Sequence, residues 1–370
     1  MTNPSVMYLV TEPWYFANHR LDHAKALLGA DFDVHVATRR GDRWDELVAA
    51  GLEVHEVDLA RGSGSLSGWW SEIRSVRRLV REQRPDVVHA VALKPLAIAL
   101  ALILMRNRPS LILGVNGLGI SAAESGRRMR VIRSVIKSAS RLPRVTLLFQ
   151  TRADQRALGE ARGTVIPGVG VDTERFLPCE RSDAPPTVVV YLGRAVASKG
   201  LTDLADACEL GGLDGVELHL YCANDPTSPG ALTEVEMEQL RRTPGIIMHE
   251  PTAQPQEVLG RAHAAILPSR AGEGVSKFVL EALACGAPVL LSAESGSGEV
   301  ISAGETGLVF AAADERSIRD VLHEFSGWSA ERWSAASAEC RQVALERYSL
   351  DQILPQIVDL HRAAAESRPR

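Results

Sequence analysis

Short runs of β-branched and apolar residues alternate with segments of helical length along most of this chain, and this alternation restricts its possible folds more than any other feature. Within residues 1–180 the runs are spaced so that a helix fits between neighbours. A strand, a helix and a second strand form a βαβ unit, and consecutive units build a parallel sheet. The six strands expected in this half are VMYLVT (6–11), DVHVAT (33–38), LEVHEVD (52–58), DVVHAV (86–91), SLILGVN (110–116) and VTLLFQ (144–149).

A stretch rich in glycine, proline and charged residues (165–186) interrupts this alternation and is predicted to be a linker. A second α/β series follows it, and the sequence from 314 onward favours helices only. We therefore expect two doubly wound, Rossmann-like α/β domains with parallel sheets that face a cleft, at 1–178 and 179–345, and a C-terminal helix in 346–370 that returns to the first domain. The five strands expected in the second domain are TVVVYLG (187–193), VELHLY (216–221), HAAILP (263–268), PVLLS (288–292) and GLVF (307–310).

Composition and cysteine spacing exclude several classes of protein. With 370 residues, 45% of them hydrophobic, the chain is long enough for two domains that each bury a core. The five cysteines contain no CxxC pair, which argues against a disulfide framework and a structural zinc site. The first residues lack the basic region of a signal peptide, and the longest apolar run (95–105) is shorter than the roughly 20 residues that span a bilayer. We expect a cytoplasmic protein with reduced thiols.

Charge is divided unevenly between the two halves. Residues 1–180 contain 25 Lys and Arg against 19 Asp and Glu, whereas residues 181–370 contain 16 against 27. Residues 126–144 contain seven basic residues and no acidic one, with an apolar face at helical spacing. Such a helix either binds the anionic inner face of a membrane or packs its apolar face on the sheet, and both alternatives stay open. The candidates for membrane contact are Arg127, Arg128, Arg130, Arg133, Lys137 and Arg141.

The most informative stretch is LPSRAGEGVSKFVLEALACGAPVLLS (267–292), whose pattern predicts a strand, a loop, a helix, a turn and a strand. Glu281 lies in an otherwise apolar part of the helix, where an unpaired carboxylate costs several kcal/mol. The vicinal hydroxyls of a ribose would satisfy this carboxylate, since each can donate to one oxygen. If the helix begins near Ser276, Glu281 lies ~7 Å along its axis from the loop that carries Glu273. That separation is comparable with the distance between the nucleoside and the sugar of a nucleotide sugar.

The backbone N–H groups of the first helical turn have no partner within the helix and can bind a diphosphate. In this sequence they belong to Gly274, Val275 and Ser276. The alternative is that the two glutamates are a surface residue in a loop and a helical residue paired with a lysine.

Two cations follow the first strand of the second domain, in VVVYLGRAVASKGLTDLADA (188–207). Arg194 stands at the carboxyl end of the strand, next to Gly193, and Lys199 stands at the start of the next helix. Both positions point toward the edge where α/β sheets bind ligands, so both side chains can neutralise a diphosphate there. We therefore expect no metal cofactor. Solvated surface charges are the alternative.

These residues resemble a known family. GRAVASKGL is similar to the Gly-Arg…Lys-Gly signature of the retaining GT-B glycosyltransferases of family 4 (glycosyl transferases group 1), and EGVSKFVLE is similar to its Glu-x7-Glu motif. PGVGVDTERF resembles the family's hinge, so the likeness extends over residues 165–310. The resemblance implies a GT-B fold and a retaining transfer of a hexosyl group from a nucleoside diphosphate sugar, with a UDP-sugar favoured, to a hydroxyl.

The resemblance also implies roles for single residues. Arg194, Lys199 and Glu273 are the implied catalytic residues: the two cations contact the donor diphosphate, and Glu273 contacts the hydroxyls of the transferred sugar. Glu281 would bind the ribose. The nucleobase is expected near His249 and Pro251. The remaining donor contacts are expected from Gly193, Gly274, Val275 and Ser276.

The first half resembles one branch of this family more loosely. Segments 16–42, 84–95, 114–120 and 149–154 are similar to enzymes that extend lipid-diphosphate-linked oligosaccharides in polysaccharide assembly. This implies a saccharide acceptor linked to polyprenyl diphosphate, with contacts expected from His19, Arg20 and Lys94; structural roles for these three are the alternative. The chain departs from the wider family in having TEPWYF, not a glycine pair, after its first strand, and in having no histidine near 114–120.

Three other motifs do not lead to a function. GLGISA (117–122) matches a dinucleotide fingerprint, but no ribose-binding acid follows about twenty residues later. Asp31 and Asp33 form an Asp-x-Asp in a turn and not in a metal loop, and no GxSxG elbow occurs. No nucleic acid partner is expected. A GT-B-fold UDP-sugar 2-epimerase and a non-catalytic sugar-nucleotide-binding protein are the rival functions.

Overall fold

The structure is a computed structural model of the 370-residue chain. It describes every residue except 1–2, 60–65, 116–126, 182–184, 227, 229, 271–273 and 368–370, and the side chains of 66 and 127–129 also lie outside the description. The chain divides into two compact units. Unit 1 contains the described residues within 1–119, 123–169 and 351–370, and unit 2 contains those within 170–350.

Unit 1 is built on a seven-stranded sheet in the order β3-β2-β1-β4-β5-β6-β7, and the strand pairs are parallel. The order reverses direction between β1 and β4, which is the arrangement of a doubly wound sheet. The strands are β1 (Ser5–Leu9), β2 (Asp33–Thr38), β3 (Glu53–Glu56), β4 (Val87–Val91), β5 (Ser110–Val115), β6 (Val145–Phe149) and β7 (Gly163–Val165).

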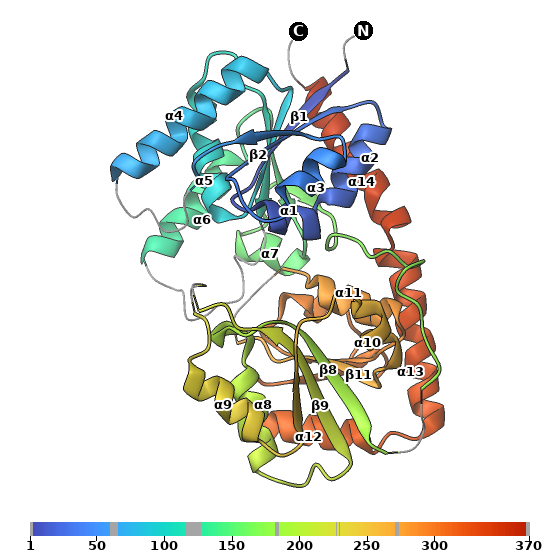
Figure 1. Cartoon of the computed structure of the whole chain (residues 1–370). Coiled ribbons are helices and arrows are strands. Elements are labelled where there is room, and N and C mark those ends of the chain that lie inside the picture. The colour runs from blue at the N-terminus through green and yellow to red at the C-terminus, as the bar shows by residue number, and fades with distance from the viewer. Residues whose placement is uncertain are drawn as a thin grey trace. The chain divides into compact units, whose positions relative to one another are not determined.

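Helices cover both faces of this sheet because successive side chains of a strand point to opposite sides. Met7 and Leu9 of β1 pack in a cluster with residues of α4, α5 and α6, whereas Val6 and Tyr8 pack with α1, α2, α3 and α14. Figure 1 shows these two groups of helices around the sheet. The elements are α1 (Pro13–His19), α2 (Leu21–Gly29), α3 (Trp44–Ala49), α4 (Leu66–Gln83), α5 (Leu93–Leu100), η1 (Ala101–Leu104), α6 (Arg127–Ala139) and α7 (Arg152–Ala157).

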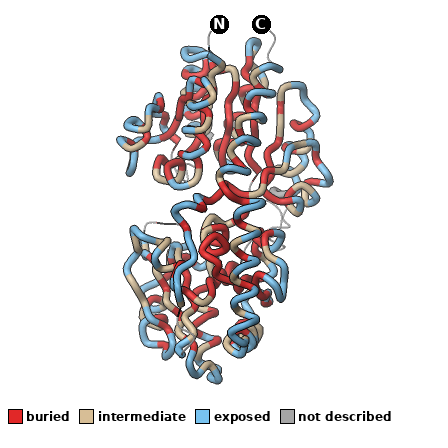
Figure 2. Tube along the Cα trace, turned by 90° about the vertical axis from the view of Figure 1, so that its right-hand side faces the viewer, coloured by how far each residue is buried: buried red, intermediate tan, exposed pale blue. Residues whose placement is uncertain are grey.

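Unit 2 contains a six-stranded parallel sheet in the order β10-β9-β8-β11-β12-β13. It is doubly wound as well, with the reversal between β8 and β11. Buried residues run along the strands in both units, while the helices alternate between buried and exposed residues (Figure 2). The strands are β8 (Thr187–Arg194), β9 (Val216–Ala223), β10 (Ile246–His249), β11 (Ala264–Leu267), β12 (Val289–Ser292) and β13 (Gly307–Phe310).

The helices of unit 2 form two packed groups, one in which α8 contacts α9 and α12 and one in which α11 contacts α10 and α13. Their apolar faces share one buried cluster with the sheet. The elements are η3 (Ala197–Lys199), α8 (Leu201–Glu209), α9 (Glu234–Arg242), α10 (Pro255–Arg261), α11 (Lys277–Ala284), η4 (Gly296–Glu299), α12 (Glu315–Ser326), α13 (Ala330–Val343) and the π-helical turn η5 (Ala344–Tyr348).

The C-terminal helix α14 (Leu350–Glu366) packs in unit 1. Ile353 and Ile357 are fully or almost fully buried in the same cluster as Val6 and Tyr8 of β1. None of the described helices is both long and apolar enough to cross a membrane.

The α/β architecture with two doubly wound parallel sheets confirms the predicted fold class. All eleven expected strands are present, and their ends differ from the predicted ends by a few residues at most. The sequence analysis missed β7 and β10. They have three and four residues, GTV and IIMH, but length alone does not explain the omission, since β13 also has four residues and was predicted.

Candidate functional site

The residues predicted to bind a diphosphate lie at the point where the sheet of unit 2 reverses direction. β8 and β11 are adjacent and parallel, and the connections that leave their carboxyl ends pass to opposite sides. The loops that follow these two strands touch each other, because the Arg270 amide donates to the Ser198 carbonyl at 2.9 Å. This edge therefore brings together the two sequence motifs that are some seventy residues apart.

Arg194 ends β8 with an exposed side chain. Its carbonyl accepts a hydrogen bond from the Tyr191 hydroxyl at 2.9 Å, and its Nη1 lies 3.5 Å from Oγ of the buried Ser228. Backbone bonds join the residues after Arg194 to the segment after Ser228: the Ala197 amide donates to Gly230, and the Leu232 amide donates to Ala195. The backbone around Arg194 is therefore held by a second chain segment, while its guanidinium faces solvent.

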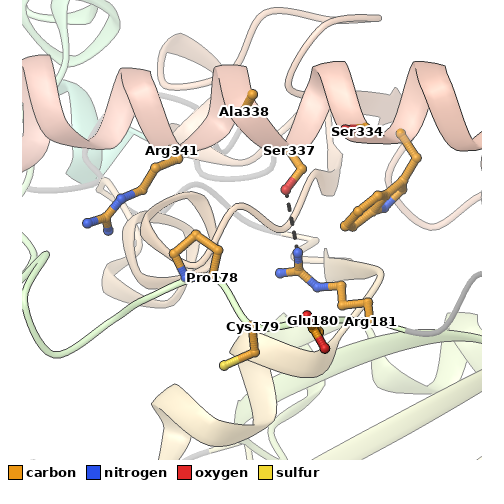
Figure 3. A pocket seen from close by; sticks show the side chains of 9 residues that line it. Pro178, Cys179, Glu180, Arg181, Ser334, Ser337, Ala338 and Arg341 are labelled. Carbon is orange, nitrogen blue, oxygen red and sulfur yellow. Dashed lines mark hydrogen bonds between the residues drawn. The ribbon is translucent and has the colours of Figure 1, made fainter.

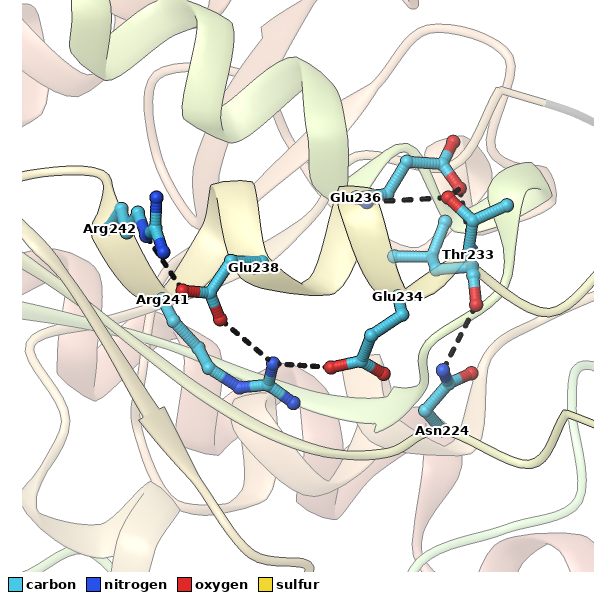
Figure 4. A network of polar contacts seen from close by, with 8 residues as sticks. Asn224, Thr233, Glu234, Glu236, Glu238, Arg241 and Arg242 are labelled. Carbon is cyan, nitrogen blue, oxygen red and sulfur yellow. Dashed lines mark hydrogen bonds and ion pairs between the residues drawn. The ribbon is translucent and has the colours of Figure 1, made fainter.

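That second segment is anchored at both ends by the network in Figure 4. Asn224 Nδ2 donates to the Leu232 carbonyl at 3.0 Å, which closes the loop after β9. Thr233 and Glu236 form a capping box at the start of α9, a device that contributes about 1 kcal/mol. The ion pairs further along α9, between Arg241 or Arg242 and the neighbouring glutamates, are exposed and contribute little.

Gly200 explains how closely the two loops pack. Its φ of +67° lies in the left-handed region, and a Cβ built on it would collide with the carbonyl of Pro268, which follows β11. Only glycine fits both conditions. Lys199 precedes it and is half-buried at the end of η3. Gly193 is also tightly placed, because a Cβ there would meet the Tyr191 hydroxyl at 2.5 Å.

The sequence analysis missed the ion pair that ties these loops to α8. Arg270 Nε donates to Asp203 Oδ2 at 2.8 Å, and its Nη2 makes a second, short bond to the same carboxylate. Asp203 is 5% exposed, and this bidentate partner raises the pKa of Arg270. Arg270 stands inside the stretch already singled out, but nothing in its local sequence distinguishes a structural cation from one that meets a ligand.

The start of α11 agrees with the prediction in position and differs in one bond. Ser276 is the N-cap residue of the helix, and Val275 before it is buried. The Ser276 amide donates to Oγ of Ser297 at 3.0 Å. We expected three amides at this helix start to be free to bind a diphosphate. For Ser276 this expectation is wrong, because its amide already donates to a buried serine of η4. Gly274 is half-buried, and Glu273 lies outside the described residues.

Glu281 is a carboxyl group in an unusual, mostly apolar setting. Its side chain is 14% exposed on a helix whose other residues, Lys277 apart, are buried and apolar. Burial raises its pKa from 4.5 to about 7, although the charges of Lys277 and Arg175 act in the opposite direction. Lys277 Nζ lies 3.8 Å from Glu281 Oε1. The alternative that this glutamate pairs with a lysine of the same helix is therefore partly correct. That partner is too weak to keep the pKa at its ordinary value.

His249, predicted to lie near a nucleobase, ends the edge strand β10 and belongs to a stack of aromatic rings. It pairs in register with Tyr221 of β9, which places the two rings 4.3 Å apart and within 7° of parallel. The His219 ring also stacks on the His249 ring, with centroids 5.0 Å apart, and His219 Nδ1 lies 3.0 Å from His249 Nε2. Burial and His219 lower the pKa of His249, so its ring is neutral at pH 7. Pro251 follows with an exposed side chain.

The three residues expected to contact an acceptor follow β1 and β4, where the sheet of unit 1 reverses direction. Lys94 Nζ lies 2.7 Å from Glu72 Oε1 and also faces the Trp69 ring, so its charge is already balanced. Arg20 is only 2% exposed. His19 is half-buried beside the Tyr15 ring. These surroundings fit the structural alternative for Lys94 and Arg20.

The basic helix α6 packs its apolar face inward. Ile136 and Ala139 are buried and Ile132 is partly buried against the core of unit 1. Lys137 Nζ donates to the Gly159 carbonyl at 2.9 Å. The structure thus shows the packed alternative for this face. Arg130 and Arg141 are exposed, Arg133 is half-buried, and the side chains of Arg127 and Arg128 lie outside the description.

A pocket elsewhere in unit 2 contains none of the predicted site residues (Figure 3). It lies between the linker at Pro178–Arg181 and α13. Arg181 covers the Trp333 ring at 4.9 Å and donates to the Cys285 carbonyl at 2.6 Å, while Arg341 donates to three further carbonyls. These bonds attach the linker to the end of α11, so the residues have a structural role.

Comparison with known proteins places this arrangement in a fold class. The structure matches that of Anabaena Alr3699/HepE in complex with UDP-glucose with a TM-score of 0.75 over 97% of this chain and 99% of that chain, at 17% identity. Two doubly wound parallel sheets, together with this match over nearly the whole of both chains, show a GT-B fold.

Sequence comparison gives the family. Residues 5–152 match the model described as Glycosyl transferase 4-like, and residues 186–325 match the model described as Glycosyl transferases group 1. The chain belongs to the GT-B glycosyltransferases that combine these two domains.

Two relatives illustrate the range of this family. WcaL of Escherichia coli strain K12, described as a colanic acid biosynthesis glycosyltransferase, is 27% identical over 44% of this chain and 41% of its own length. A glycogen synthase of Mycobacterium tuberculosis is 28% identical over 80% of this chain and 76% of its own length. The match to WcaL thus spans less than half of that relative.

Proposed function

We propose that the chain is a retaining glycosyltransferase that moves a hexosyl group from a UDP-sugar to a hydroxyl of a saccharide acceptor. The observation that carries this proposal is Glu281: a buried carboxyl with a raised pKa, on the helix that starts beside the loops of β8 and β11. A ribose offers two hydroxyl donors to such a group, and binding would recover part of the cost of burying its charge.

The departing diphosphate would lie against Arg194 and Lys199. The backbone that carries both side chains is held by bonds to neighbouring segments at the reversal of the sheet, and two cations there would stabilise negative charge on a leaving group electrostatically. With two cations present we propose that transfer requires no metal ion. Glu273 would hold the hydroxyls of the transferred sugar, and the donor phosphate would accept the proton of the attacking hydroxyl, as the family resemblance implies.

The choice of a UDP-sugar is supported by the solved complex of Anabaena Alr3699/HepE with UDP-glucose. The ring pair of Tyr221 and His249 offers a flat surface for a base at the same edge of the sheet. We propose that the acceptor is a lipid-linked saccharide used in polysaccharide assembly, a suggestion supported by the named role of WcaL in colanic acid biosynthesis.

Donor binding tests the proposal directly. A thermal-shift series with UDP-glucose, UDP-GlcNAc, GDP-mannose and ADP-glucose should show stabilisation of about 2.7 kcal/mol by the preferred donor at a hundredfold excess over its Kd. Arg194→Ala and Lys199→Ala should each weaken binding about tenfold or more, whereas Arg332→Ala, an exposed residue of α13, should not. If no nucleotide sugar stabilises the wild type, the proposal is wrong.

Two assays separate the rival functions. Incubation with UDP-GlcNAc alone yields an epimer only if the protein is a 2-epimerase, which needs no acceptor. A non-catalytic binding protein would bind the donor but release no UDP when saccharide acceptors are supplied.

Contact with a membrane forms a separate part of the proposal. Because the apolar face of α6 is packed, binding would depend on exposed residues of the helix and of the turn after it. Arg130 lies on the helix and Arg141 in that turn, and Val131 and Val135 of the helix are 58% and 48% exposed. Arg130→Glu with Arg141→Glu should weaken binding to anionic vesicles. Arg316→Glu with Arg332→Glu, exposed residues of unit 2, makes the same change in net charge as a control. Equal binding by both double variants would exclude α6.

A further inference from the structure

Two neighbouring strands at the edge of unit 1 bring together a group of side chains that the proposed reaction does not use. His35 lies on β2, and Glu53 and His55 lie on the edge strand β3. Glu53 and His55 are two residues apart, so they share one face of the sheet. The register pairs His35 with Glu53 and Ala37 with His55, which places all three side chains on that face.

The polar atoms of this group converge on one point. His35 Nδ1 lies 3.1 Å from His55 Nε2 and 3.2 Å from Glu53 Oε2, and one ligand atom from each residue lies within 4.8 Å of the others. In a tetrahedral site with bonds of about 2.0–2.1 Å, neighbouring ligand atoms are separated by roughly 3.3 Å. The two shortest separations are therefore already close to those of a metal site.

Unit 2 contains a natural comparison. Glu217 and His219 on β9 and His249 on the edge strand β10 are the same residue types on the corresponding pair of strands, although here the glutamate and one histidine lie on the inner strand and not on the edge strand. There, however, Glu217 contacts Nε2 of His219 while His249 contacts its Nδ1, so the partners lie at opposite sides of one ring. One ion cannot reach both. In unit 1 both partners meet the same nitrogen of His35.

We propose that His35, Glu53 and His55 bind a divalent transition metal ion, with Zn²⁺ as the representative. Two imidazoles and one carboxylate are a ligand set of the kind found in zinc sites, and three protein ligands leave a position for water. Glu53, whose side chain is 63% exposed, gives access from solvent, while His35 is 8% exposed and holds the inner position. The ion would connect the edge strand β3 to β2 and stabilise this end of the sheet.

The test uses the full-length protein after removal of metal with a chelator that is then dialysed away. Titration with Zn²⁺ against a chromophoric competitor should show one ion per chain. Glu53→Gln and His55→Gln should weaken binding by about 10- to 100-fold or more, since loss of an outer partner alone has effects of that size. Both positions have exposed or half-buried side chains, so the variants should fold, which thermal unfolding without metal checks.

Glu217→Gln is the matched control and should bind Zn²⁺ as the wild type does. Co²⁺ gives an independent readout, because a tetrahedral site produces strong visible absorption that Glu53→Gln should remove. The proposal is overturned if the wild type binds less than one ion per chain, if Glu53→Gln and His55→Gln bind as tightly as the wild type, or if Glu217→Gln weakens binding equally.

Discussion

Replacing Glu281 with glutamine should make the protein more stable at alkaline pH and leave its stability in acid unchanged. The pKa of this carboxyl is about 7 in the folded chain against an ordinary value of 4.5. An acid whose pKa is raised by folding stabilises the folded state below its unfolded pKa, and this contribution is lost as the pH rises through the folded pKa. Since one pKa unit corresponds to ~1.36 kcal/mol, the wild type should lose about 3 kcal/mol between pH 4.5 and pH 7.

The measurement is urea unfolding of wild type and Glu281→Gln at several pH values between 4.5 and 8. The difference in free energy of unfolding should be near zero at pH 4.5 and should grow to about 3 kcal/mol in favour of Glu281→Gln at pH 8. Lys277→Gln is the control for the 3.8 Å ion pair on the same helix: it removes a charge that lowers the pKa of Glu281, so it should destabilise the protein at pH 8.

The same variant separates a ligand-binding acid from a structural one. If Glu281 binds the ribose, Glu281→Gln should bind the preferred UDP-sugar more weakly although it is the more stable protein. A less stable Glu281→Gln at pH 8 would refute the reasoning, because it would show that the ion pair with Lys277 outweighs the burial of the carboxylate.

Three further variants test other features of the structure. Arg341→Ala should lower the free energy of unfolding in urea by about 3 kcal/mol, because the Arg341 guanidinium donates to the carbonyls of Thr173, Phe176 and Ala284 at 2.8–2.9 Å. The control Arg332→Ala should lower it by less than about 1 kcal/mol, and equal losses would contradict this reasoning. Gly200→Ala should lower the melting temperature more than Gly211→Ala. Both glycines have positive φ, but only at position 200 would the new Cβ collide with Pro268. A smaller effect at Gly200 would show that the loops after β8 and β11 are not in contact. His361 is buried and bonded to His89, and burial lowers its pKa to about 4, so stability present above pH 6.5 should decrease by about 3 kcal/mol as the pH falls through 4. Burial lowers the pKa of His89 as well, so His361→Asn in a Glu281→Gln background should make the decrease seen in urea unfolding smaller by about that amount without abolishing it. An unchanged pH profile would assign the decrease to other groups.

The architecture could be predicted because it depends on local patterns. Buried parallel strands are continuous apolar runs, and most of the eleven recognised strands are of this kind, although β3 (EVHE) has no buried residue and β9 alternates between buried and half-buried residues. β10 was not recognised. The stack of Tyr221 on His249 was therefore missed as well, because it exists only where β10 pairs with β9 in that register.

The individual bonds of the candidate site depend on contacts that no local pattern records. Ser297 lies 21 residues after Ser276 and accepts a hydrogen bond from its amide, and Glu72 lies 22 residues before Lys94 and accepts one from its Nζ. The sequence analysis had assigned both of these donors to a ligand. A cation or an amide at a strand end or helix start has the same local sequence whether its partner is a substrate or a distant side chain.

Glu281 differs from these residues because its partner in the structure does not offset the cost of burying its charge. Lys94 and Arg270 have carboxylates at close distance that balance their charges, so nothing further is needed to explain them. Lys277 lies 3.8 Å from Glu281 and the pKa of that carboxyl is still raised, so part of the cost of its burial is not offset within the described chain. Stability alone favours an apolar residue here, as at the other buried positions of α11. An acid that is costly to the fold at this position is best explained by a ligand that donates hydrogen bonds to it.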